Sequence, residues 1–99
     1  MSEQIVRYEI QPKGLDGKTL SLLQHSGALK AVEIVADGSI IYVRFTLKNS
    51  SDAVAFTTSG KLKRWVTIDA AVKWLKTLGI GQAKIEFLYW LPKQMSLRV

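Results

Sequence analysis

The sequence predicts an α+β fold, in which an antiparallel β-meander of about five to six strands carries one main amphipathic helix on one face. Two runs of β-branched and aromatic residues, 31–35 and 40–47, flank Asp37-Gly38, which favours a hairpin because glycine adopts positive φ without steric cost. Helical periodicity is strong over 68–78. The 99 residues suffice for a single domain, 1–99, with its own core.

Further strands are predicted where apolar residues alternate between turn residues. Polar residues at 49–52 and the Ser59-Gly60 pair mark two of these turns, and Pro92 ends the last strand. The stretch 20–28 forms either a short helix that Gly27 closes or a covering loop. The predicted strands are 4–10, 31–35, 40–47, 53–58, 61–67 and 83–90.

The helix over 68–78 is predicted from its ends and its apolar face. Thr67 or Asp69 can cap the exposed amides at its start, and Gly79 suits the left-handed position after its end. Its apolar side chains fall within an arc of about 160°, and this face should pack on the sheet. The arc contains Ile68, Ala71, Val72, Trp74, Leu75 and Leu78.

The positive charge is concentrated in one part of the chain. Fourteen Lys and Arg against eight Asp and Glu give a formal charge of +6. Residues 1–60 carry six of each sign, so the whole excess lies in 61–99. A basic region of this kind favours an anionic partner such as nucleic acid, although it is also compatible with a merely solubilising surface.

Residues suited to catalysis or metal binding are sparse. The absence of cysteine excludes disulfides, zinc–thiolate sites and a thiol nucleophile. His25 is the single histidine, and the carboxylates are scattered without metal-ligand spacing. We therefore expect a non-enzymatic protein with no catalytic residues, no metal and no cofactor.

Alternation along two predicted strands places basic and aromatic side chains on one sheet face. Ile41, Val43 and Phe45 suit the core, which turns the intervening residues the other way. Cations that follow phosphates and rings that stack on bases suit single-stranded DNA. The alternatives are a solvated sheet face and an acidic protein partner. The predicted nucleic-acid-binding residues are Tyr42, Arg44, Lys48, Lys61, Lys63 and Trp65.

Residues 87–91 are five large apolar side chains in succession, so both faces of this strand need cover. The helix can cover one face, and a homodimer interface, with the tail 93–99 across it, can cover the other. Alternatively, residues 15–29 fold over that side. A second possible function is a protein-interaction or inhibitor module that uses 85–91 and the tail. The predicted interface residues are Trp74, Leu78, Phe87, Tyr89 and Trp90.

The N-terminus has neither a basic n-region nor an apolar h-region, and no run is long enough to span a membrane. We therefore expect a cytoplasmic protein with no membrane partner.

Residues 60–71 (GKLKRWVTIDAA) and 74–80 (WLKTLGI) are similar to segments of small accessory proteins of bacterial plasmids and integrative elements. The predicted meander followed by a helix also resembles the PC4-like single-stranded-DNA-binding fold. That resemblance implies a dimer whose curved sheets carry the DNA and whose helices meet, with Trp74 and Leu78 facing the partner. The strand 83–90 after the helix departs from the PC4-like pattern.

Overall fold

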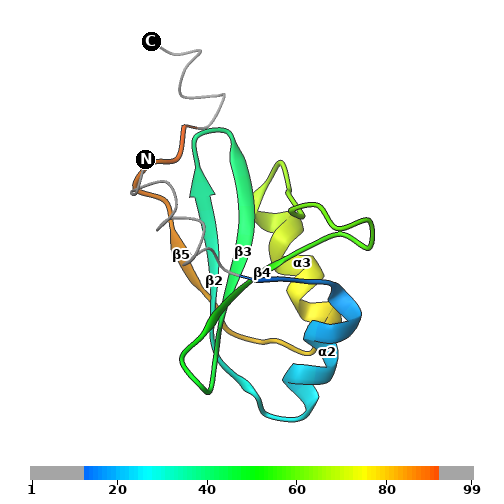
Figure 1. The fold of residues 1–99 in the computed structure, drawn as a ribbon. Coiled ribbons are helices and arrows are strands. Elements are labelled where there is room, and N and C mark those ends of the chain that lie inside the picture. Colours follow the sequence, from blue (N-terminus) through cyan, green and yellow to red (C-terminus); the bar gives the residue numbers. More distant parts are fainter. Residues whose placement is uncertain (1–12, 92–99) are drawn as a thin grey trace, which may run out of the picture.

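The computed structural model describes residues 13–91, in which two helices cover one face of a five-stranded sheet (Figure 1). The predicted α+β class is confirmed, but the sheet is mixed rather than a pure meander. Its order is β1-β4-β3-β2-β5, and both outer strands run parallel to their neighbours. The elements are β1 (Lys13–Leu15), α2 (Gly17–His25), β2 (Leu29–Asp37), β3 (Ile40–Leu47), β4 (Asp52–Ala55), α3 (Ile68–Thr77) and β5 (Lys84–Glu86).

The β2–β3 hairpin forms where Asp37-Gly38 predicts it. Asp37 pairs with Ile40, and Gly38 has a φ of +61°, which suits the first central position of a type II′ turn. The predicted alternation along β3 is also confirmed, because Ile41, Val43 and Phe45 are fully buried. These side chains point toward the helices.

Helix α3 matches its predicted bounds closely. The Thr67 side chain accepts a hydrogen bond from the Ala70 backbone N–H at 3.1 Å, and Gly79 follows the helix with a φ of +84°. Ala71 and Leu75 are buried against the sheet. Val72 is the exception in the predicted apolar arc, because it remains 40% exposed.

The stretch for which the sequence left helix or loop open is helix α2. Asp16 caps it by accepting a hydrogen bond from the Thr19 backbone N–H at 2.9 Å. The fully buried Leu20 joins α2 to the core. Both helices therefore contribute to a single core, whose buried members are Leu20, Ile34, Ala36, Ile41, Val43, Phe45, Ala55, Ala71, Leu75, Leu78 and Ile80.

The Asp16 cap makes helix α2 sensitive to acid. The Thr19 N–H that donates to the Asp16 carboxylate holds its pKa below the ordinary value. Its contribution is therefore complete above the unfolded-state pKa of about 3.9 and is lost as the pH falls through the lower, folded-state pKa. We expect thermal unfolding between about pH 2 and pH 5 to be less pH-dependent in Asp16→Asn, because asparagine also caps but does not titrate. An unchanged pH dependence would contradict this role.

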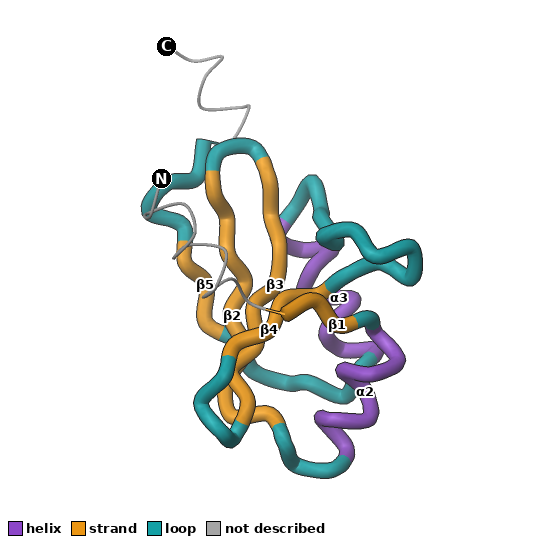
Figure 2. The backbone as a smooth tube through the Cα atoms, viewed as in Figure 1, coloured by secondary structure: helices purple, strands orange, loops and turns teal. Residues whose placement is uncertain are grey.

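Several predicted strands differ from the observed ones. The strand predicted at 61–67 is wrong: Leu62 and Trp65 make only isolated bridges to Phe56 and Ile41, and Figure 2 shows this part of the chain as loop. The strand predicted at 83–90 is reduced to the three residues of β5, which lie at a sheet edge and not beneath the helix. The strand at 53–58 ends at Ala55, and 4–10 lies outside the described residues.

Candidate nucleic-acid interface

The structure does not assemble the predicted basic and aromatic sheet face. Tyr42 and Arg44 do lie on the face of β3 opposite the buried Val43 and Phe45. However, Val35 and Val54, which pair with them in the sheet, are buried, and Tyr42 and Arg44 are half-buried. Burial raises the pKa of the Tyr42 hydroxyl. This face is therefore not a plane of exposed rings onto which bases could stack.

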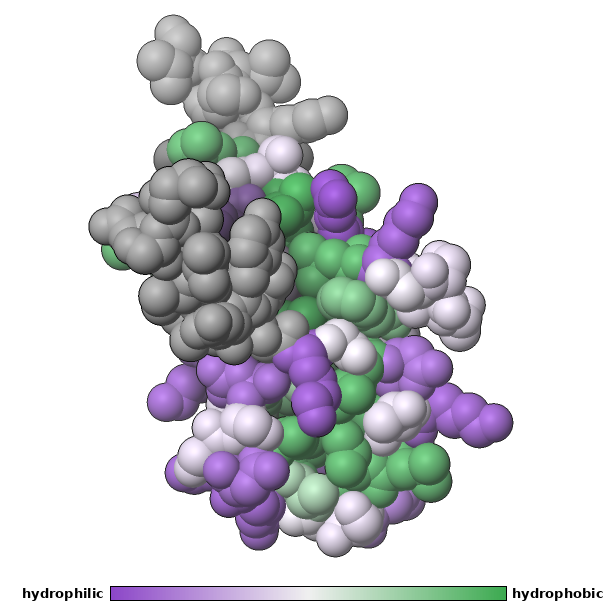
Figure 3. All heavy atoms as spheres, in the orientation of Figure 1, coloured by the Kyte–Doolittle hydropathy of each residue, from purple (hydrophilic) through white to green (hydrophobic). Residues whose placement is uncertain are grey.

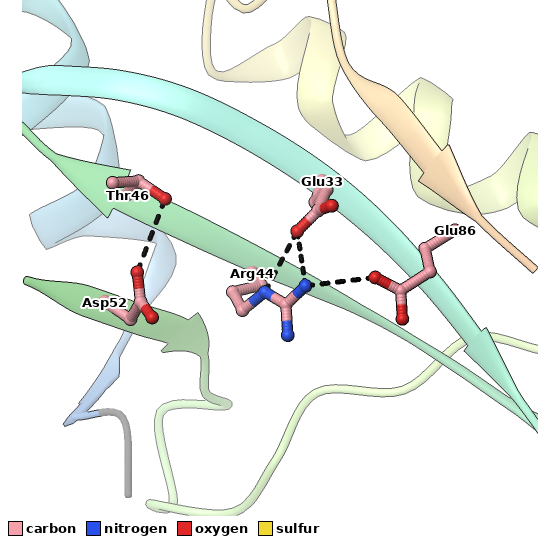
Figure 4. A network of polar contacts seen from close by, with 5 residues as sticks. All are labelled: Glu33, Arg44, Thr46, Asp52 and Glu86. Atoms are coloured by element: carbon pink, nitrogen blue, oxygen red, sulfur yellow. Dashed lines mark hydrogen bonds and ion pairs between the residues drawn. The ribbon is translucent and has the colours of Figure 1, made fainter. Parts of the chain in front are cut away.

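Carboxylates neutralise Arg44 on this face. Its guanidinium Nε donates to Glu33 Oε1 at 3.0 Å and its Nη2 to Glu86 Oε1 at 3.2 Å, which links β3 to β2 and β5 (Figure 4). The hydrogen bond to Glu33 raises the pKa of the guanidinium. Arg44 is thus committed to the sheet rather than available to a phosphate.

The other charged residues described on this face do not give it an excess of positive charge. Thr46 donates to Asp52 Oδ1 at 3.3 Å, beside the Arg44 network (Figure 4). The register of β2 with β5 places Lys84 level with Glu33. Among the described residues of this face, the carboxylates of Glu33, Asp52 and Glu86 outnumber the cations of Arg44 and Lys84, so these residues offer no excess of positive charge to a polyanion.

Trp65 lies elsewhere, against helix α3. Its ring centroid is 5.1 Å from that of Trp74, with the ring planes tilted by 47°. Lys63 Nζ lies 5.5 Å from the Trp65 centroid and 5.6 Å from the Trp74 centroid, so one ammonium group faces two indoles. We call Lys63, Trp65 and Trp74 the tryptophan cluster. Both rings pack against the core but keep part of their surface exposed.

Backbone hydrogen bonds fix the tryptophan cluster in place. The Lys63 N–H donates to the Ala55 carbonyl and the Trp65 N–H to the Ile41 carbonyl, each at 2.9 Å. Only Val66 separates Trp65 from Thr67, the N-cap of α3, so the backbone of Trp65 lies at the start of that helix. Trp74 comes from two turns further along α3, on the side that faces the start of α2 at Gly17.

A basic loop, which we define as residues 57–66, leads into this cluster. Its tip is closed by hydrogen bonds from the Thr57 N–H to the Lys61 carbonyl at 2.7 Å and from the Gly60 N–H to the Thr57 carbonyl at 3.0 Å. Lys61 and Arg64 are exposed. Within residues 13–91, neither they nor Lys63 forms an ion pair, whereas Lys73 pairs with Asp69 at 3.2 Å. Figure 3 shows hydrophilic side chains projecting on this side of the molecule.

The sequence-predicted binding residues therefore separate into three groups. Lys61, Lys63 and Trp65 come together, and Trp74 joins them although it was predicted as an interface residue. Tyr42 and Arg44 belong to the opposite sheet face. Lys48 stands in the turn after β3, away from the basic loop (Figure 1).

The predicted interface residues separate in the same way. Leu78 is a buried core residue and is not available to a partner. Trp90 is half-buried and packs against the core, whereas Phe87 and Tyr89 are exposed. The alternative cover predicted for residues 87–91, the segment 15–29, does not lie over them. Helix α2 in that segment instead packs into the core with α3 through Leu20.

Within the described part of the chain, no three His, Cys, Asp or Glu side chains gather in a way that could hold a metal ion. None of the helices of residues 13–91 is long and apolar enough to cross a membrane. No family model, curated protein or solved structure matches this chain.

Proposed function

We propose that this protein binds nucleic acid without catalysing a reaction, and that single-stranded DNA is its preferred ligand. The binding surface consists of the basic loop and the tryptophan cluster. The observation that carries the proposal is the position of Lys63 between two partly exposed indoles, with Lys61 and Arg64 beside it. The proposed surface keeps three of the sequence-predicted residues and replaces the sheet face with a loop and a helix.

The chemistry of the two parts is complementary. Lys61 and Arg64 extend from a loop with closed backbone geometry, and together with the Lys63 ammonium they offer three cations to successive phosphates. Trp65 and Trp74 offer ring surface to an unpaired base, and base–aromatic stacking contributes about 1–3 kcal/mol per base. A base in a duplex has no free face, and therefore the cluster favours single strands.

Fluorescence anisotropy of a labelled oligothymidylate tests this function. Three phosphate contacts give a salt slope of about −2, so affinity should fall about 20-fold between about 50 and about 200 mM salt. Tryptophan emission should be quenched as the bases stack. A duplex of the same length should bind more weakly. If the oligonucleotide does not bind even at low salt, the proposal is wrong.

A second candidate function is protein–protein interaction through the residues after β5. It is supported by the exposure of Phe87, Leu88 and Tyr89, three large side chains in succession. Such an association should be insensitive to salt and should weaken in Leu88→Asp. Trp90 is unsuitable for this test, because it packs against the core and its replacement would also destabilise the fold.

A further inference from the structure

We propose that this chain forms a two-fold homodimer by antiparallel pairing of β5 with β5 of a second copy, centred on Ile85. Strand β5 is the last strand of the sheet, with β2 on its inner side and no other described strand on its outer side. The outward backbone N–H and C=O groups of such an edge are a template for another strand.

The charges on β5 are complementary to those of an identical strand. In antiparallel pairing, residues opposite each other share a face of the sheet. A two-fold axis through Ile85 therefore places Lys84 of each copy opposite Glu86 of the other, so that the interface gains two ion pairs. Lys84 is exposed, and the Glu86 side chain is 47% exposed while one of its oxygens contacts Arg44.

The other edge of the sheet lacks this property. A two-fold axis through the middle of β1 would place Lys13 opposite Leu15, which pairs a charge with an apolar side chain. The ring of Phe56 also lies directly against Gly14 on that strand. The charge pattern therefore favours self-pairing at β5 over self-pairing at β1.

The helix side of β5 carries apolar surface that pairing about the same two-fold axis would bury. Ile85 is 43% exposed and lies at a groove of about 330 Å³ between β5 and α3. Two copies of Ile85 would meet at the axis, beside the exposed Val72 of each copy. If the same register continues beyond β5, Phe87, which is 60% exposed, lies opposite the exposed Ala83 of the second copy. The apolar groove lining includes Ile34, Val72, Leu75, Ile80 and Ile85.

Backbone hydrogen bonds fix the exposed residues that follow β5. The Gly38 N–H donates to the Tyr89 carbonyl, and the Leu91 N–H donates to the Gly38 carbonyl, each at 2.8 Å. The tip of the β2–β3 hairpin thus fixes this segment while Leu88 and Tyr89 stay exposed. A second copy would find this surface already formed.

A charge-exchange experiment with the full chain tests the pairing. Sedimentation velocity from about 1 µM to about 1 mM should show a concentration-dependent dimer. Lys84→Glu alone brings carboxylates together across the axis, and Glu86→Lys alone brings ammonium groups together, so each variant should be monomeric. Their equimolar mixture restores both opposite-charge pairs and should dimerise. A monomeric wild type, single variants that still dimerise, or a mixture that stays monomeric would each overturn the proposal.

A cross-link provides a second readout, because Glu86→Lys also removes a contact to Arg44. The chain has no cysteine, so in Ile85→Cys a disulfide can form only between residue 85 of two copies. Opposed strand residues have Cα atoms about 4.5–5.5 Å apart, within the range of a disulfide. Mild oxidation should yield a covalent dimer, whereas Lys13→Cys on the opposite edge should form no covalent dimer although it still associates through β5. Equal cross-linking of both variants, or of neither, would contradict pairing at β5.

Discussion

Replacing Phe45 with alanine is expected to remove a large part of the stability of this protein. Phe45 is fully buried at the centre of the sheet, in the cluster that also contains Leu20 of α2 and Leu75 of α3. Truncating a buried phenylalanine costs about 3–5 kcal/mol, because the ring's burial is lost and a cavity remains. The total free energy of unfolding of a domain of this length is only about 5–15 kcal/mol. Urea unfolding followed by tryptophan fluorescence should therefore show a much lower midpoint.

The neighbouring residue provides the control. Thr46 points to the opposite face, where its hydroxyl donates to Asp52 on the surface. Thr46→Ala should reduce the free energy of unfolding by about 1 kcal/mol or less. A loss below about 1.5 kcal/mol in Phe45→Ala would mean that the two helices do not share one core through this ring.

Elements with strong local signals were predictable from the sequence. The hairpin follows from Asp37-Gly38, and α3 follows from Thr67, Gly79 and the apolar arc between them. No strand was predicted at β1, and the strand predicted at 83–90 contained β5 but not its short length or its place at the sheet edge. Each outer strand is three residues long and pairs in parallel with a strand distant in sequence, so its position depends on the rest of the fold.

The site was only half predictable, for two physical reasons. Alternation in 61–67 resembles a strand, but the packing of Trp65 on Trp74 draws this segment over to α3. For Arg44, the alternation along β3 predicted the correct face of the sheet but not the carboxylates that pair with the guanidinium. The hairpin register that pairs Asp37 with Ile40 also places Glu33 opposite Arg44. The neutralising carboxylate could therefore have been found from the sequence, whereas Glu86 could not.

Reversing the three cations of the basic loop is expected to abolish the proposed binding of single-stranded DNA. Lys61→Glu, Lys63→Glu and Arg64→Glu together remove about three phosphate contacts and introduce repulsion. Affinity at low salt should fall about 100-fold or more, and the salt dependence of whatever binding remains should flatten. Anisotropy titrations at two salt concentrations measure both effects. Circular dichroism confirms that the variant is folded.

The matched control reverses three exposed lysines at the other end of the sheet, Lys13, Lys30 and Lys48. Both triple variants lower the net charge of +6 by the same amount, so the long-range field changes equally. Only the position of the charges differs. If the basic loop and the tryptophan cluster form the site, the control should lose much less affinity and keep its tryptophan quenching. Equal losses would show that overall charge, and not this surface, attracts the nucleic acid.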